Sequence, residues 1–455
     1  AAAPATRSAL AALGALCVVA ALPGSATAGP GDLPPYRHAD GAERSQGARS
    51  SADGPRLEAG GTYTATLAPG EKRYWSVELD AETQPWISAV APPEPGSAVT
   101  YRDGIRLTLE DADGTTCDTA DAGIDDDGAA RPVAAVAGRI RTPDGRCQEA
   151  GVYHFSVERE ERAEEDASDP APWPLELRVM REPGLESITS TTPPETGELP
   201  TTPPRPPAGE AEELTGGTGF NDAPGMGEGV WKDRLRPGQT RFYRVPVDWG
   251  QQLALSAEFG TVGGADDGYV SDGVRVDLHN PARGHVDGGS ATYRPDDPAA
   301  VPLLAPPVRY VNRYSYNDAL AASAHAGWYY VAVHAHAGLR EVLRGGDGTV
   351  PVTLRTTLTG APQQGPPYDG DAVAAGFGVG DAEREQAEQG LSAQEAAARA
   401  GRSDTLRLVG VAGIGTGTLL LAGLGAWTVL ARRRSPGEAG VPGGPYGAPQ
   451  PPHGG

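Results

Sequence analysis

"LAPGEKRYWSVELD", residues 67–80, returns farther along the chain as "LRPGQTRFYRVPVD", residues 235–248. In both stretches a Pro-Gly turn signal precedes a run in which apolar and polar residues alternate. Trp75, Val77 and Leu79 are the apolar members of the first run. A period of two places such side chains on one face, which is typical of a half-buried antiparallel strand.

The similarity extends beyond this stretch. Further matched segments follow in the same order, and the spacing between matched partners grows only slowly along the chain. They are ISA (87–89) with LSA (255–257), DGIR (103–106) with DGVR (272–275), AGVY (150–153) with AGWY (326–329), and PLELR (174–178) with PVTLR (351–355). One domain is therefore present twice, as a tandem. Short strands between Gly/Asp/Pro loops predict an all-β fold, with antiparallel β-sandwich or jelly-roll domains at residues 55–181 and 215–360.

The matched motifs also resemble a known family. Leu-x-Pro-Gly before an aromatic pair, then Asp-Gly-(Ile/Val)-Arg, then Ala-Gly-x-Tyr before a β-run, resemble the bacterial pre-peptidase C-terminal domain. The resemblance covers both predicted domains and implies a small β-sandwich in an extracellular setting. It implies no catalytic residue, and no peptidase domain accompanies it here.

The segment 1–28 is typical of a signal peptide. Arg7 provides the positive region, an apolar run extends over residues 9–22, and Ala26-Thr27-Ala28 forms a small-x-small cleavage site. This segment predicts that the following residues are exported.

A second apolar run predicts a transmembrane helix at residues 406–431. Residues 408–431 contain no charge, and Arg432, Arg433 and Arg434 follow directly. The positive-inside tendency places these arginines and the Gly/Pro-rich tail, residues 432–455, in the cytoplasm. We expect a single-pass plasma-membrane protein whose N-terminal side is extracellular. Gly-rich spacing in the span permits close helix contact, which leaves open both a homodimer and a span that is merely rich in glycine.

Three segments outside the repeats predict flexibility. Residues 29–54 are expected to be disordered, and the Pro/Thr-rich residues 182–214 to form a semi-rigid linker that lets the two domains unfold separately. Residues 361–405 predict a flexible or helical polar stalk with no apolar face. Within it, Ser392 and Glu395 have the spacing of a capping box.

The cysteines predict one disulfide. Cys17 leaves with the signal peptide, so Cys117 and Cys147 remain in an oxidising compartment. Their bridge would close a loop of about 30 residues, which stabilises by roughly 3 kcal/mol in the loop-entropy model.

Charge and composition narrow the class of partner. The chain has 60 acidic and 38 basic residues, a net charge of −22, which argues against nucleic acid and anionic lipid as partners. The preference for arginine over lysine, with abundant Ala, Gly and Pro, is typical of a GC-rich genome and favours an actinobacterial source.

Two patterns raise the question of a metal. Acid-rich loops at residues 110–128 and 263–273 offer the oxygen ligands that Ca²⁺ prefers, but without EF-hand spacing. A bound calcium and a solvated acidic loop both stay open. His334 and His336 share one face of a strand. Because the alternation puts them on the outer face, we interpret them as solvated and assign no metal or other cofactor.

The segment RYVNRYSYN, residues 309–317, is the candidate binding face. If it is extended, Tyr310, Asn312, Tyr314 and Tyr316 share one side. Tyrosine and asparagine suit contacts with a sugar or a protein. The alternative is a strand whose aromatic side chains pack on the sandwich.

These observations favour a non-enzymatic cell-surface binding or scaffolding protein, with an unidentified envelope protein or glycan as partner. No Gly-x-Ser-x-Gly context or other nucleophile motif indicates catalysis. The alternative is an accessory subunit that assists a separate secreted peptidase or export apparatus.

Overall fold

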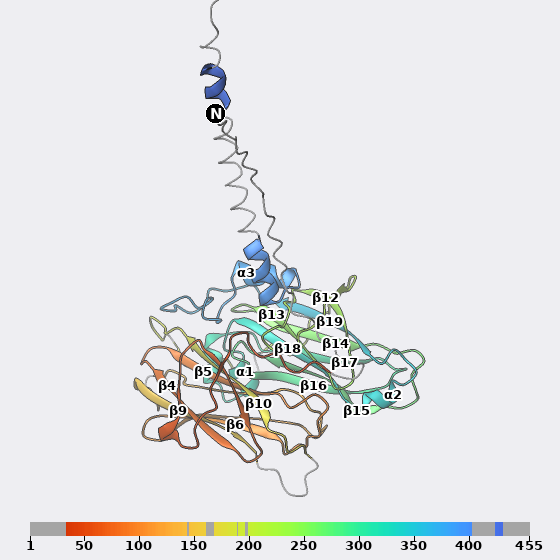
Figure 1. Ribbon diagram of the computed structural model, residues 1–455, viewed down its shortest axis with the longest axis horizontal. Helices are drawn as coiled ribbons and strands as arrows, with labels where there is room; N and C mark the ends of the chain where they lie inside the picture. Colours follow the sequence, from red (N-terminus) through yellow and green to blue (C-terminus); the bar gives the residue numbers. More distant parts are fainter. Residues whose placement is uncertain are drawn as a thin grey trace, which may run out of the picture. The chain divides into compact units, whose positions relative to one another are not determined.

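The computed structural model describes residues 33–142, 145–160, 168–188, 190–195, 199–402 and 424–430. The chain divides into two compact units, residues 1–390 and 391–455, and both repeats belong to the first (Figure 1). The signal peptide, the cytoplasmic tail and most of the expected span lie outside the described residues. Within the described part of the chain, no helix has the length and apolar character needed to cross a membrane. The membrane anchor therefore stays a prediction.

The first copy, sandwich 1, consists of two five-stranded sheets, ordered β1-β3-β10-β5-β8 and β2-β4-β9-β6-β7. Its strands are β1 (Glu43–Arg44), β2 (Arg56–Leu57), β3 (Thr62–Leu67), β4 (Lys72–Leu79), β5 (Gln84–Ala91), β6 (Gly104–Glu110), β7 (Thr116–Gly123), β8 (Val133–Gly138), β9 (Gly151–Arg159) and β10 (Trp173–Glu182). A short 3-10 helix, η1 (Ser51–Asp53), precedes β2.

The second copy, sandwich 2, has sheets ordered β11-β12-β19-β14-β17 and β13-β18-β15-β16. Its strands are β11 (Glu212–Glu213), β12 (Gly229–Leu235), β13 (Thr240–Val247), β14 (Gln252–Phe259), β15 (Val270–His279), β16 (His285–Tyr293), β17 (Ala299–Leu304), β18 (Gly327–Ala335) and β19 (Val350–Thr359). Its helices are η3 (Tyr310–Tyr314), α1 (Asp318–Ala322) and α2 (Leu339–Val342), and α3 (Asp381–Glu388) follows.

The two copies have the same topology. When the eight long strands of each copy are numbered along the chain, one sheet has the order 1-8-3-6 and the other the order 2-7-4-5. Successive strands thus cross from sheet to sheet, except strands 4 and 5, which form a hairpin within one sheet, as in a double-sheet jelly roll. The predicted tandem of jelly-roll domains is confirmed at the level of the fold.

The repeated phrase occupies the same place in both copies. Gly70 and Gly238 have positive φ angles of 71° and 83°, which an L-residue adopts only with strain, so both turns favour glycine. The following strands, β4 and β13, bury Trp75 and Tyr243 in two separate cores, and neither side chain is exposed. In sandwich 1, Trp75 stacks on Phe155 of β9 at 5.6 Å between ring centres.

The N-terminal segment is not disordered over residues 33–54, and this prediction is wrong. β1 pairs in parallel with β3, and the indole Nε1 of Trp75 donates to the carbonyl oxygen of Ser45 at 3.1 Å. Tyr36 is only 8% exposed. The segment is held because it extends a sheet edge and covers a core tryptophan, which a polar composition does not reveal.

The expected stalk is also packed over residues 361–390. Phe377 is fully buried, and α3 lies on β13, where Ala387 is 1% exposed. Arg384 of α3 pairs with Asp248 at 2.7 Å. The prediction of a polar segment with no apolar face is wrong here, because Phe377 and Ala387 are spaced too widely to form a helical stripe.

The second unit begins with a helix at residues 393–402. The backbone N–H of Glu395 donates to Ser392 Oγ at 3.3 Å, and the backbone N–H of Ser392 donates to Glu395 Oε2 at 2.9 Å. The predicted capping box is confirmed.

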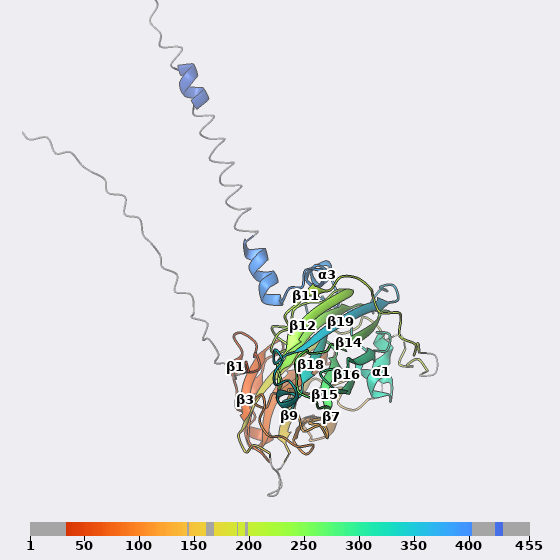
Figure 2. The same ribbon diagram turned by 90° about the vertical axis from the view of Figure 1, so that its right-hand side faces the viewer.

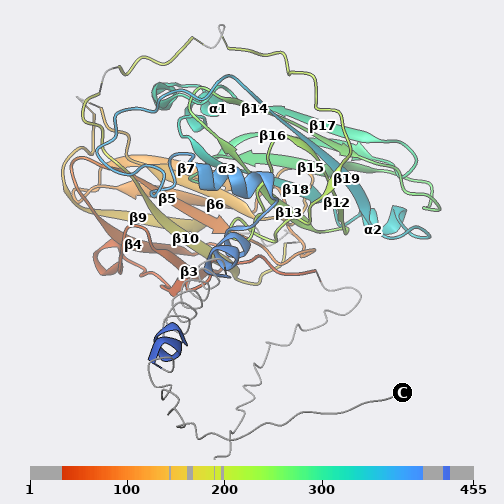
Figure 3. The ribbon, with the colours of Figure 1, turned by 90° about the horizontal axis from the view of Figure 1, so that it is seen from above.

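The described part of the linker runs on the outside of the first unit (Figure 3). Its side chains are mostly exposed over residues 199–213. Gln252 Nε2 donates to the carbonyl oxygen of Pro200, and Arg355 Nη1 to that of Pro207. The linker is therefore extended and attached to sandwich 2 at these points.

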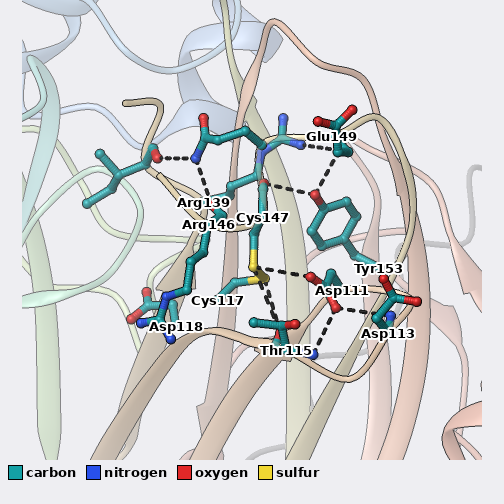
Figure 4. Close-up of a disulfide and its surroundings, with 12 residues drawn as sticks. Asp111, Asp113, Thr115, Cys117, Asp118, Arg139, Arg146, Cys147, Glu149 and Tyr153 are labelled. Atoms are coloured by element: carbon teal, nitrogen blue, oxygen red, sulfur yellow. Dashed lines mark hydrogen bonds between the residues drawn. A yellow bond between two sulfur atoms is a disulfide. The ribbon is translucent and has the colours of Figure 1, made fainter. Parts of the chain in front are cut away.

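The predicted disulfide is confirmed. Cys117 at the start of β7 is bonded to Cys147 in the loop before β9, with a sequence separation of 30 (Figure 4). The Tyr153 hydroxyl donates to the carbonyl oxygens of Cys147 and Glu149, and Arg139 Nη1 donates to that of Glu149. The bridge and these hydrogen bonds attach the long β8–β9 loop to sandwich 1.

Candidate functional site: the junction between the two sandwiches

Sheets from different sandwiches meet face to face. Figures 1 and 2 show the orange strands of sandwich 1 lying against the green and teal strands of sandwich 2. An apolar cluster fills part of this junction, with Val90 of β5 and Ala134 of β8 against Phe242, Tyr330 and Ala332 of β13 and β18. The junction joins the β3-β10-β5-β8 sheet of one copy to the β13-β18-β15-β16 sheet of the other.

The first buried ion pair of the junction joins Glu176 of β10 to Arg283 in the β15–β16 turn. Arg283 Nη1 donates to Glu176 Oε1 at 2.5 Å, and the Asn221 amide donates to the same carboxylate at 3.0 Å. The backbone N–H of Ala39 adds a bond at 2.8 Å. Burial alone would raise the pKa of Glu176, but the Arg283 guanidinium, and after it His38 and Asn221, hold it well below its usual range.

The second ion pair joins Glu182, at the end of β10, to Arg313 of η3. Two parallel N–H···O bonds of 2.8 Å connect the groups, and both side chains are 0% exposed. Trp86 Nε1 and the Tyr368 hydroxyl also donate to this carboxylate. Burial would raise the pKa of Glu182, yet Arg313 and then His325 hold it well below its usual range.

The predicted binding face is not extended. Residues 310–314 form η3 because the buried Asn312 amide donates to the carbonyl oxygens of Pro307 and Ser323. Tyr310 accepts a hydrogen bond from Gln84 of sandwich 1, and Tyr314 donates to the carbonyl of Arg141. Tyr316 alone of the four is exposed. The expectation of one shared face is wrong, and the segment instead connects the two sandwiches.

The outer face of β18 is not solvated either, which corrects the interpretation of His334 and His336. His334 is 2% exposed and shares a hydrogen bond of 2.9 Å with Thr240 Oγ1. Burial, and next the charge of Arg131, lower its pKa to about 3. His336 Nε2 lies 3.2 Å from the carbonyl oxygen of Asp127 in sandwich 1.

Sequence reasoning missed a visible signal for this burial. Trp328, Tyr330 and Ala332 alternate with inward Tyr329, Val331 and Val333, so β18 is apolar on both faces. Such a continuous apolar run is typical of a strand covered on both sides.

The acidic loops show no assembled cation site in the part of the chain that the structure describes. There, no group of three or more His, Cys, Asp or Glu side chains is close enough to hold a metal ion. Asp111 accepts bonds from the backbone N–H groups of Asp113 and Thr115, and Asp125 pairs with Arg131 and Arg275. These contacts give both aspartates a structural role, and calcium stays an untested prediction.

An open cavity of about 290 Å³ lies along the junction, here named the junction pocket. Both sandwiches line it: sandwich 1 contributes Thr62 and Arg178, and sandwich 2 contributes Arg244, Arg283 and Trp328. Asn221, from the segment before β12, completes its polar lining. The pocket presents cationic groups and hydrogen-bond donors beside aromatic rings.

Comparisons with known proteins define no family. No family model matches the chain. No curated protein matches it. One similar solved structure is the CUB1-EGF-CUB2 domain of human MASP-1/3, 8% identical over 65% of this chain and 99% of that chain, with a TM-score of 0.15. Another is the CBM22-1-CBM22-2 tandem domain of Paenibacillus barcinonensis Xyn10C, 13% identical over 67% of this chain and 92% of that chain, with a TM-score of 0.19. Because these TM-scores are low, the likenesses carry no functional argument.

Proposed function

We propose that the protein is a non-enzymatic binding or scaffolding protein of the cell envelope, anchored in the plasma membrane with both sandwiches outside. The observation that carries this proposal is the junction. Two fully buried ion pairs and an apolar cluster make one unit of two sandwiches, and an open pocket lined by both remains between them.

The lining of the pocket supports binding rather than catalysis. Nucleophilic catalysis needs a nucleophile with a base in hydrogen-bond reach. The described lining has the hydroxyl groups of Thr62 and Tyr330 but no histidine, lysine or carboxylate to act as their base. Its neighbouring carboxylate, Glu176, is already engaged by several donors. Rigid, pre-formed groups of this kind suit a binding site, since little ordering cost is paid on association.

The test uses the soluble protein of residues 29–402, which includes the whole part of the first unit that follows the predicted signal peptide. Immobilised protein should retain an envelope glycan or an envelope protein from a membrane-free envelope extract of the source cells. Glu182→Ala, which removes a junction ion pair, should reduce this capture. Thr359→Ala, at the matched position of sandwich 2, should not. Equal capture by both variants, or turnover of a captured molecule, would contradict the proposal.

A further inference from the structure

The junction pocket has more positive charge than its neighbouring carboxylate balances. Arg178, Arg244 and Arg283 line it, and Glu176 pairs with Arg283 alone among them. Within the described residues, neither Arg178 nor Arg244 has a carboxylate oxygen within 4.0 Å in an ion pair. This contrasts with a chain whose net charge is −22.

Desolvation makes these charges costly. Burial lowers the pKa of Arg178, and the charge of Arg283 lowers it further. Burial likewise lowers the pKa of Arg244. A guanidinium nevertheless stays protonated in proteins, so the partly buried Arg178 and the buried Arg244 both keep their positive charge. A bound anion would offset that cost directly.

Arg244 and Arg283 are held in place by aromatic rings and neutral hydrogen-bond acceptors. The guanidinium carbon of Arg244 lies 4.1 Å from the ring centre of Trp328, and its Nη2 donates to Gln386 Oε1 at 3.0 Å. Arg283 lies over the Phe220 ring, and its Nη2 donates to Asn221 Oδ1 at 2.8 Å. Stacking and neutral acceptors fix the planes of these groups. The charge of Arg283 is already balanced by Glu176, whereas the charge of Arg244 stays available.

The matched position in the other copy shows that the fold does not require an unpaired arginine. Arg355 of β19 corresponds to Arg178 of β10 in the repeat. Arg355 Nε donates to Glu258 Oε1 at 2.8 Å, and its Nη1 donates to the carbonyl oxygen of Pro207. Sandwich 2 thus pairs its arginine, whereas sandwich 1 presents its arginine to the pocket.

We propose that the junction pocket binds an oxyanion group, a carboxylate, sulfate or phosphate, carried by a small ligand or by the exposed end of an envelope glycan. Arg178 and Arg244 would donate charge-assisted hydrogen bonds to it, with Asn221 and Thr62 as neutral neighbours. The volume of about 290 Å³ is at the lower end of ligand pockets, which suits one such group with a small body. The proposal rests on the binding function above and specifies its ligand class.

The direct test is equilibrium dialysis of the soluble protein of residues 29–402 with glucuronate, sulfate and inorganic phosphate, at constant ionic strength in chloride. Neutral glucose serves as the control ligand. The wild type should bind at least one anion and not glucose. Arg178→Gln and Arg244→Gln should weaken binding about tenfold or more, since each removes a charge-assisted hydrogen bond. Arg355→Gln should stay within about twofold of the wild type.

Thermal unfolding without added anion separates a site from a structural role. Removing Arg178 relieves repulsion with Arg283 but also removes its hydrogen bond with Tyr330. Arg178→Gln should therefore unfold close to the wild-type temperature and lose the rise in unfolding temperature that added anion causes. Arg178→Lys, which keeps the charge without the planar fork, should bind more weakly than the wild type but better than Arg178→Gln.

Two results would overturn the inference: a wild type that binds none of the three anions, or an Arg355→Gln variant as impaired as Arg178→Gln. If envelope capture by the wild type persists in either case, the binding function stands and only this ligand class is wrong. Competition by free glucuronate against glycan capture indicates a glycan-borne group. Binding of the free anion without such competition indicates a small soluble ligand.

Discussion

Matched strands of the two sandwiches are alike on their inner faces and different on their outer faces. On β10, Glu176 and Glu182 point into the junction and are 0% exposed, whereas Thr353 and Thr359 hold the matched positions on β19 and are partly exposed. Both strands nevertheless keep an apolar inner face for their own core. The residues on the inner face of each strand therefore specify the jelly roll. The residues on its outer face specify whether another sandwich covers that face.

On the matched strands β18 and β9 the difference is reversed, because here the covered outer face belongs to sandwich 2. The outer face of β18 has Trp328, Tyr330, Ala332 and His334, matched on β9 by Val152, His154, Ser156 and Glu158. The two copies thus pack through non-equivalent sheets, so each needs only one altered face. This arrangement explains why a clear sequence repeat forms one compact unit and not two.

The largest loss of unfolding free energy is expected when the junction loses an ion pair. Glu182→Ala leaves Arg313 buried without its carboxylate and should cost about 3–5 kcal/mol of unfolding free energy. Thr359→Ala, the matched change on an uncovered face, should cost about 0.5 kcal/mol or less. Urea unfolding of the soluble protein of residues 29–402 measures both. Similar losses in the two variants would mean that the outer faces do not differ energetically.

The cores provide the next comparison. Trp75→Ala and Tyr243→Ala each remove a fully buried ring and should cost about 3–5 kcal/mol. Because the junction joins the sandwiches, calorimetry should show one common transition lowered by either change, in place of the separate unfolding expected from the linker. In the Glu182→Ala background the two transitions should separate. Two independent transitions in the wild type would show that the junction couples the copies weakly.

The disulfide belongs to sandwich 1 alone. Replacing both cysteines, Cys117→Ser with Cys147→Ser, should cost about 3 kcal/mol, because the bridge closes a loop with a separation of 30 residues. In the Glu182→Ala background, calorimetry should assign this loss to the transition that Trp75→Ala also lowers. A loss in the transition of sandwich 2 would contradict the separation of the two cores.

The smallest effect is a pH dependence that distinguishes β18 from β9. Burial holds the pKa of His334 at about 3, below its ordinary 6.5. As the pH falls, His334 is therefore protonated at a lower pH in the folded state than in the unfolded state. Its contribution to stability is present above pH 6.5 and falls as the pH drops toward 3, by about 1 kcal/mol at pH 5.5.

Urea titrations at pH 7.5 and 5.5 test this dependence. His334→Asn should reduce the loss between the two pH values, while His154→Asn, on the outer face of the matched strand β9, should leave it unchanged. An equal acid dependence in His334→Asn and the wild type would show that this histidine titrates normally.

The sequence by itself determined the tandem, the jelly-roll class, the inward positions of Trp75 and Tyr243, and the Cys117–Cys147 bridge. These features depend on local signals: a period of two, a Pro-Gly turn, and the pairing of two cysteines. Only the tertiary structure decided the junction, because Glu176 and Arg283 meet across 107 residues and Glu182 and Arg313 across 131. A strand with charged residues on its outer face shows the same alternation of apolar and polar residues whether that face contacts water or another sheet. Burial of the outer face therefore depends on contacts that no local pattern encodes.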